Sequence, residues 1–187
     1  MQKPYTTDQI FTNETALAMG EYDNCTFRHC TLANTNLSEY VFTDCVFEHC
    51  DLSMANLSNT SFREVKFVQC KLLGLHFDEC NPFSLSFEFE TCLLNLSSFY
   101  RLKIKNTQFT DCKMEEVALE ESDLTNAVFK NCDLRGAIFD QTILVGADLR
   151  TAVSFSIDPE RNTIQKAKFS MQNIAGLLHK YKISISQ

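Results

Sequence analysis

Leucine or phenylalanine returns at every fifth position over long stretches of this chain. One series runs from Phe27 to Phe77, and a second, shifted by two residues, runs from Phe89 to Leu149 with only apolar residues at the repeated position. A period of five matches neither the 3.6 residues of an α-helix nor the two of a β-strand. It fits a square coil in which each five-residue unit forms one side and a turn, so four units close a 20-residue coil.

Two further regularities support coils that stack in register. The phrase that begins with phenylalanine recurs at residues 27, 47, 67, 89, 109 and 129. We call the repeated Leu, Phe or other apolar position the centre of its five-residue unit, and nearly every residue two positions before a centre is small. Alternating large and small side chains would fill a narrow interior without voids. The two-residue shift falls around Asn81, Pro82 and Phe83, where proline cannot donate a ladder hydrogen bond, and predicts a bulge or corner loop.

The units ANLSN, CDLRG and ADLRT resemble the A(D/N)Lxx consensus of the pentapeptide-repeat family. This resemblance covers about residues 20–153 and implies an all-β solenoid, the right-handed quadrilateral β-helix of that family. We therefore expect an N-terminal cap over residues 1–21, with a weak beat at Leu17 and Tyr22. Residues 22–153 should form the β-helix of about six to seven coils.

The tail predicts a different structure. The beat stops after Leu149, residues 156–159 suggest a linker, and Ser170 can cap a short α-helix within residues 154–187. Five residues make an apolar stripe on that helix: Met171, Ile174, Leu177, Leu178 and Tyr181. So short a helix needs a surface to pack on, either the last coil or a second subunit.

The tail also carries its own resemblance. The segments SIDPERN and AGLLHKYKI are similar to the end of microcin-immunity proteins of the McbG type. Quinolone-resistance proteins of the Qnr type, in the same family, end in a helical segment that joins two rods. This resemblance implies a homodimer through the apolar stripe, while an intramolecular cap remains the alternative.

Six of the nine cysteines occur once per period. They are Cys30, Cys50, Cys70, Cys92, Cys112 and Cys132. Stacked coils would place them in one interior column about 4.8 Å apart. Side chains in register point the same way, which is poor geometry for a disulfide, so we expect reduced thiols that act as small hydrophobic groups.

The usual catalytic and cofactor motifs, such as GxSxG, GxGxxG, HExxH and CxxC, are missing. His29 and His49 precede column cysteines and should point outward, while His76 and His179 lack partners at ligand spacing. We therefore expect no catalytic residues, cofactor or metal. No stretch resembles a membrane span or a signal peptide, so the sequence predicts a cytoplasmic protein that does not enter a membrane.

The net charge of −7 is unevenly distributed: residues 14–90 hold 12 acids and four bases, whereas residues 150–187 hold two acids and six bases. An acidic body repels phosphate, which argues against direct nucleic-acid binding. Acidic residues are densest between 111 and 123, and we expect these to form a partner-binding acidic face: Asp111, Glu115, Glu116, Glu120, Glu121 and Asp123.

Qnr-type proteins are proposed to imitate duplex DNA on type II topoisomerases. The resemblance therefore implies a non-enzymatic DNA mimic that binds DNA gyrase or topoisomerase IV and confers immunity or quinolone resistance. A structural scaffold with an unrelated protein partner is the alternative function.

Overall fold

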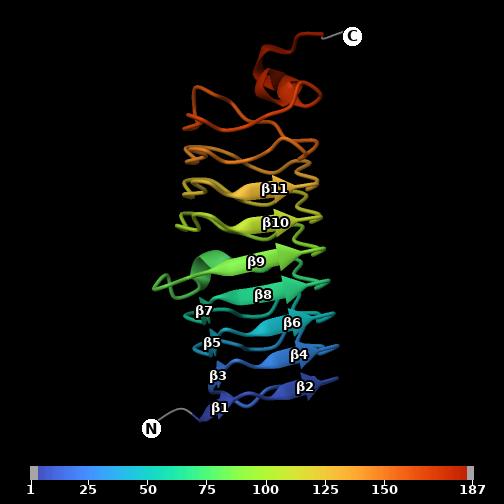
Figure 1. Ribbon diagram of the computed structural model, residues 1–187, viewed down its shortest axis with the longest axis vertical. Coiled ribbons are helices and arrows are strands. Elements are labelled where there is room, and N and C mark those ends of the chain that lie inside the picture. The colour runs from blue at the N-terminus through green and yellow to red at the C-terminus, as the bar shows by residue number, and fades with distance from the viewer. Residues whose placement is uncertain (1–3, 185–187) are drawn as a thin grey trace.

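The computed structural model describes residues 4–184 and shows a stack of coils with the N-terminus at its base and the C-terminal segment at its top (Figure 1). Two sides of the stack are parallel sheets. The first contains β1 (Tyr5–Thr7), β3 (Glu21–Asp23), β5 (Val41–Thr43) and β7 (Ser61–Arg63). The second contains β2 (Ile10–Thr12), β4 (Thr26–Arg28), β6 (Val46–Glu48), β8 (Val65–Val68), β9 (Phe87–Glu90), β10 (Gln108–Thr110) and β11 (Val128–Lys130).

The register repeats once per coil along both sheets. Phe27 lies opposite Phe47, and Phe109 lies opposite Phe129. The other two sides are joined by single parallel bridges, such as Asp51 with Lys71 and Ser98 with Ala118. The prediction of an all-β quadrilateral β-helix is therefore confirmed.

The coil turns at residues with a left-handed backbone. The residue two positions after most centres has a positive φ, between 50° and 63° where it is not glycine, as at Asn24, His29 and Leu96. This conformation costs an L-residue roughly 1–2 kcal/mol, which the backbone hydrogen bonds between neighbouring coils must offset. Corner side chains lie on the outside of the coil, so most are exposed and the fold leaves their chemistry free to vary.

Phenylalanine rings form a continuous stack through the core. Phe27, Phe47, Phe67, Phe89 and Phe109 are each 0% exposed, and successive rings lie 4.5–5.4 Å apart in parallel. The six column cysteines are buried free thiols, as predicted, and they donate to carbonyls of the preceding coil, for example Cys50 Sγ to Phe27 O at 3.3 Å. The interior therefore satisfies even its weakly polar groups.

The predicted irregularity around residue 82 is present. A 3₁₀ turn, η1 (Phe77–Glu79), leads into a loop that protrudes beside β9 in Figure 1. Phe83 at this loop is 72% exposed. The ladder resumes with Val65 opposite Phe87, so the insertion is absorbed in the loop without breaking the second sheet.

The first coil lies in the segment that the sequence assigns to an N-terminal cap, of which residues 1–3 lie outside the described part. β1 pairs with β3 and β2 pairs with β4, and Leu17 packs partly buried against the core. Both sheets therefore begin within the segment that the sequence assigned to the cap.

The predicted linker near residue 156 is wrong, because the ladder continues through it. Phe155 and Ile157 are buried, and bridges join Ile143 to Thr163 and Asp148 to Lys168. Buried Asn162 replaces an apolar inward residue and donates to Phe139 O at 3.2 Å. A hydrogen-bonded polar group can occupy the interior, so the loss of the apolar beat did not end the coil.

The expected C-terminal α-helix is also wrong. Two 3₁₀ turns, η2 (Ile174–Leu177) and η3 (His179–Tyr181), form instead, without a side-chain cap from Ser170. The side-chain amide of Asn173 donates hydrogen bonds to Leu149 O at 2.7 Å and to Ala152 O at 2.9 Å. Gly176 packs so closely on Phe155 that an added Cβ would lie 2.5 Å from the ring. These contacts hold the segment against the last coil as a cap; residues 185–187 lie outside the described part.

Candidate partner-binding surfaces

The six predicted acidic residues are distributed over several sides of one coil instead of forming one face. Asp111, Glu116 and Glu121 occupy successive corners, with φ between 54° and 55°. Glu115 and Glu120 lie on the sides between those corners, and Asp123 lies on the next side, bridged to Lys103. Residues that are neighbours in sequence thus point in different directions around the rod.

Basic neighbours neutralise two of these carboxylates. Arg101 binds Glu121 at 2.7 Å, and hydrogen bonds from Arg101 and then Tyr100 hold the Glu121 pKa below its usual range. Lys105 lies 3.2 Å from Asp123. Burial raises the pKa of Asp123, but hydrogen bonds from Thr125 and the nearby Lys105 outweigh it, so this pKa also lies below its ordinary value. Their contribution to a negative field is reduced by the adjacent cations.

Of the remaining four carboxylates, two have an amide partner and two have no ionic partner within the described residues. Asn131 donates to Asp111 at 2.9 Å, and Asn95 reaches Glu115 at 3.4 Å. Glu116 and Glu120 make no ion pair within residues 4–184. This coil therefore presents scattered negative charge on several sides.

A more continuous acidic surface lies on the first sheet. It consists of Asp8, Glu21, Asp23, Asp44 and Glu64, which we call the acidic edge. Asp8 follows β1, Asp44 follows β5 and Glu64 follows β7, all at left-handed corners, while Glu21 and Asp23 flank the buried ring of β3.

Backbone hydrogen bonds fix the spacing of the acidic edge. Asp8 N donates to Asp23 O at 3.1 Å, and Asp44 N donates to Arg63 O at 2.9 Å. Asn24 occupies the one uncharged corner in this series, and its amide donates to Asp8 at 2.7 Å. This hydrogen bond, and after it one from Thr7, lowers the pKa of Asp8. The corners therefore repeat at the strand spacing of about 4.8 Å.

Sequence reasoning missed the acidic edge because most of its members lie in different coils and are far apart along the chain. They could have been found by comparing the residues at one corner, two positions after a centre, from each 20-residue coil to the next. Among the described strands of this sheet, Arg63 in β7 is the one basic residue.

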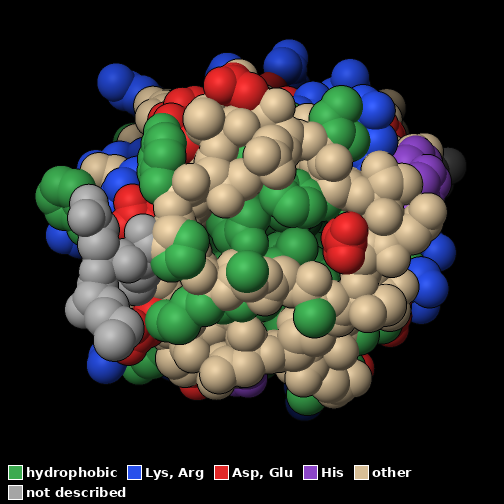
Figure 2. All heavy atoms as spheres, turned by 90° about the horizontal axis from the view of Figure 1, so that it is seen from below, with side chains coloured by type: hydrophobic (Ala, Val, Ile, Leu, Met, Phe, Trp, Pro, Cys, Tyr) green, Lys and Arg blue, Asp and Glu red, His purple; other side chains and the backbone are tan. Residues whose placement is uncertain are grey.

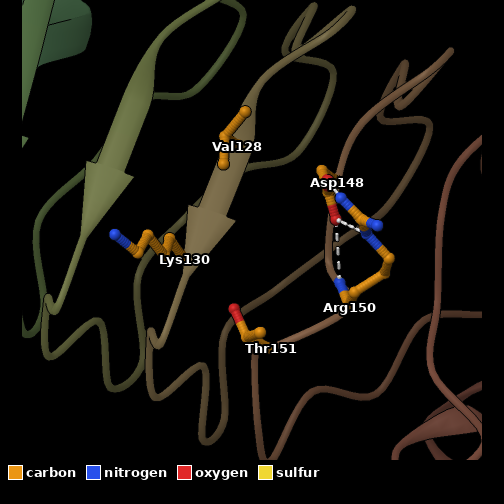
Figure 3. A pocket seen from close by; sticks show the side chains of 5 residues that line it. All are labelled: Val128, Lys130, Asp148, Arg150 and Thr151. Carbon is orange, nitrogen blue, oxygen red and sulfur yellow. Dashed lines mark hydrogen bonds and ion pairs between the residues drawn. The ribbon is translucent and has the colours of Figure 1, made fainter.

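A surface hollow of about 300 Å³ lies near the other end of the rod, lined by Val128, Lys130, Asp148, Arg150 and Thr151 (Figure 3). Arg150 is already bound to Asp148 at 2.6 Å, and Lys130 points away from this pair. The hollow is therefore not a preformed anion site.

His29 and His49 are exposed, as predicted, while Cys30 and Cys50 beside them are buried; the two imidazole rings stack with centroids 4.9 Å apart. Within the described residues, no group of three or more His, Cys, Asp or Glu side chains is arranged to hold a metal ion. No helix of the described chain is long and apolar enough to cross a membrane.

The predicted dimerisation residues divide between two environments. Leu177 packs partly buried on the core and Leu178 is half-buried. Met171, Ile174 and Tyr181 are 83%, 42% and 55% exposed. The segment thus caps the coil and still presents apolar surface outward, so dimerisation stays a prediction.

Comparison with known proteins agrees with this architecture. The family profile described as "Pentapeptide repeat region" matches residues 21–88 and 86–169. The chain belongs to the pentapeptide-repeat family. The second match ends at residue 169, where the ladder seen in the structure also ends.

Among solved structures, the chain is similar to QnrB1, described as a plasmid-mediated fluoroquinolone resistance protein. A trypsin-treated variant aligns over 100% of both chains with a TM-score of 0.63 and 15% identity. The full-length protein aligns over 96% of this chain and 100% of its own, with a TM-score of 0.59 and 17% identity. At such identity the likeness concerns the fold. No curated protein sequence matches this chain.

Proposed function

We propose that this pentapeptide-repeat protein is a non-enzymatic DNA mimic that binds a type II topoisomerase, DNA gyrase or topoisomerase IV, in the cytoplasm. It thereby protects the cell from a topoisomerase poison, as an immunity or quinolone-resistance factor. The observation that carries the proposal is the acidic edge, a series of carboxylates repeated along one side of a rigid rod.

The charge density of the N-terminal coils supports this proposal. Residues 4–64 contain nine acids and two bases, and they span four levels of the stack. At a strand spacing of about 4.8 Å this amounts to roughly one net negative charge per 2–3 Å, compared with about one per 1.7 Å for duplex DNA. This net charge is summed over all sides of the N-terminal coils, and it would attract a positively charged groove that normally holds DNA.

The test combines supercoiling and quinolone-induced cleavage assays with purified gyrase and topoisomerase IV, titrating the protein from sub-stoichiometric amounts to large excess. We expect inhibition of supercoiling or relief of cleavage, and weaker binding at higher salt. The variant D44K/E64K reverses two corners of the acidic edge and should weaken binding by on the order of 10-fold or more.

Two matched variants separate the surfaces. E116K/E120K/E121K reverses three carboxylates on the coil that the sequence favoured and should have the smaller effect, since Arg101 already neutralises Glu121. N59D changes a corner of a neighbouring column and serves as a conservative control. Unchanged affinity in D44K/E64K would refute the acidic edge as the contact surface.

The second candidate function is a scaffold for an unrelated protein. The exposed Phe83 on the loop beside β9 favours it, because aromatic side chains are enriched at the centres of protein interfaces. This function predicts no effect on either topoisomerase at any protein concentration, and loss of the unrelated partner on F83A.

A further inference from the structure

Two exposed histidines lie one above the other on the outside of the rod. His29 and His49 occupy the same corner of successive coils, with φ of 53° and 54°. Their imidazole rings stack with centroids 4.9 Å apart and planes inclined by 8°. Seen along the axis of the rod, histidine side chains lie at its outer rim (Figure 2). Solvent therefore reaches both rings.

Backbone hydrogen bonds fix the positions from which the two rings extend. His29 N donates to Glu48 O and His49 N donates to Val68 O, both at 2.9 Å. The strands that precede the two corners, β4 and β6, pair in register. The two backbones are thus held at the strand spacing of about 4.8 Å, and only side-chain torsions need to be fixed when both rings bind one ion.

This spacing allows two imidazole nitrogens to converge on one metal ion. A transition metal lies about 2.0–2.1 Å from an imidazole nitrogen, so two neighbouring ligands need nitrogens about 3 Å apart. Rings whose centroids are 4.9 Å apart reach that separation by tilting toward each other. Both side chains are exposed, so this tilt leaves the packed interior unchanged.

The surroundings of the pair do not repel a cation. A hollow of about 350 Å³ beside the rings is lined in addition by Thr31, Asp51, Gln69 and Lys71. Lys71 lies 3.9 Å from Asp51, and Arg28 is bound to Glu48 at 2.7 Å. Both basic side chains thus have a carboxylate partner, and the hollow has room for water molecules that complete the coordination of an ion.

The thiols beside the rings point into the core and are not available as ligands. Cys50 Sγ donates to Phe27 O at 3.3 Å, and Cys30 Sγ donates to Arg28 O at 3.5 Å. The donor set is therefore two imidazoles and water, which is consistent with residues 4–184 holding no metal-ligand group of three or more side chains. Imidazole suits Cu²⁺, Ni²⁺ and Zn²⁺, and of these Cu²⁺ binds most tightly to a given set of ligands.

We propose that His29 and His49 form a two-histidine site for a divalent first-row transition metal ion, with Cu²⁺ the tightest ligand. The bound ion joins two successive coils on the outside of the rod. Mg²⁺, which prefers oxygen ligands, does not bind there. Ligand spacing along the chain misses this pair, because its members are 20 residues apart. The site does not depend on the proposed topoisomerase target.

Calorimetric titration with NiCl₂ at about pH 7.5 is the first test, since neutral imidazole is the ligand. The chain has four histidines, so H76A/H179A retains only the pair, and H29N/H49N removes it. Asparagine already occupies such corners, as at Asn24 and Asn34, so these variants should keep the circular dichroism of the wild type.

We expect H76A/H179A to bind Ni²⁺ like the wild type, and MgCl₂ to give no binding heat. H29N and H49N should each bind Ni²⁺ on the order of 10- to 100-fold more weakly, because chelation by a second imidazole is lost. Equal affinities of the wild type and H29N would overturn the proposal, as would wild-type affinity in H29N/H49N.

A relocated pair tests the geometry. H29N/Q69H places the second imidazole one coil beyond His49, at an exposed corner with φ of 53°, and should restore the affinity of the wild type. H29N/N131H is the matched control, since Asn131 occupies the same corner four coils from His49, and it should bind like H29N. Equal binding by these two variants would refute chelation by neighbouring coils.

Electron paramagnetic resonance of H76A/H179A with one equivalent of CuCl₂ reports the ligands directly. We expect two imidazole nitrogens in the equatorial plane of the ion. A spectrum with a single coordinated imidazole would overturn the two-histidine site.

Discussion

Phe109 tests whether stacking between coils stabilises this fold. Its side chain is 0% exposed and lies between two parallel rings, 5.2 Å from Phe89 and 5.1 Å from Phe129. F109A removes a buried aromatic group in the middle of the rod and leaves a cavity that neighbouring coils cannot close. We expect the free energy of unfolding to fall by about 3–5 kcal/mol.

The same substitution in the first described coil is the matched comparison. Phe11 stacks on Phe27 at 5.1 Å but is only partly buried, with no coil beneath it among residues 4–184. F11A should therefore lower the free energy of unfolding by about half as much as F109A. F83A, at a side chain that is 72% exposed, should change it by less than about 0.5 kcal/mol.

Urea titration followed by circular dichroism and tyrosine fluorescence provides the measurement, since the chain has no tryptophan. Coincident transitions with similar slopes would allow the midpoints to be compared as free energies. A loss at F11A equal to or larger than that at F109A would refute the argument that interior coils gain stability from neighbours on both sides.

Three further predictions concern the corners, the thiols and the cap. G146A should lower the free energy of unfolding by about 1 kcal/mol, because Gly146 has a φ of 69° and a Cβ added there would lie 2.5 Å from Asn126 Oδ1. The shift of the urea midpoint measures this loss. Burial raises the pKa of Cys45 to about 12, so a thiol reagent at pH 8 should label this residue only after denaturation, as mass spectrometry of labelled peptides would reveal. A hydrogen bond from Lys180 lowers the Asp158 pKa in the folded protein. The stability that this pair gives the cap is therefore present above the unfolded pKa of about 3.9 and is lost as pH falls through the lower folded pKa. Methyl NMR shifts of the cap should follow this pH dependence in the wild type and lose it in D158N.

The interior of this protein could be predicted from its sequence because a narrow coil accepts few side chains. Large centres alternate with small residues, and a side chain of the wrong size at either position would leave a void or a clash, so the interior positions can be recognised in the sequence. The prediction failed where a polar group satisfied its hydrogen bonds inside the stack, at Asn162, and where an amide capped the last carbonyls, at Asn173. Both depend on contacts about one coil away, which hydrophobicity along the chain does not record.

The outer surface was harder to predict, because neighbours in space lie one coil apart along the chain and neighbours in sequence lie around different corners. Ion pairs such as Arg28 with Glu48 and Arg101 with Glu121 join residues one coil apart, although Arg150 binds Asp148 only two residues away. A dense acidic run such as residues 111–123 is therefore distributed around the rod and partly neutralised by the coil before it, whereas Asp44 and Glu64, each alone in its own segment, belong to one edge. In a solenoid of this period, the charge that a partner meets is the sum along a column of corners, and that sum is most negative along the corners Asp8, Asp44 and Glu64 of the N-terminal third.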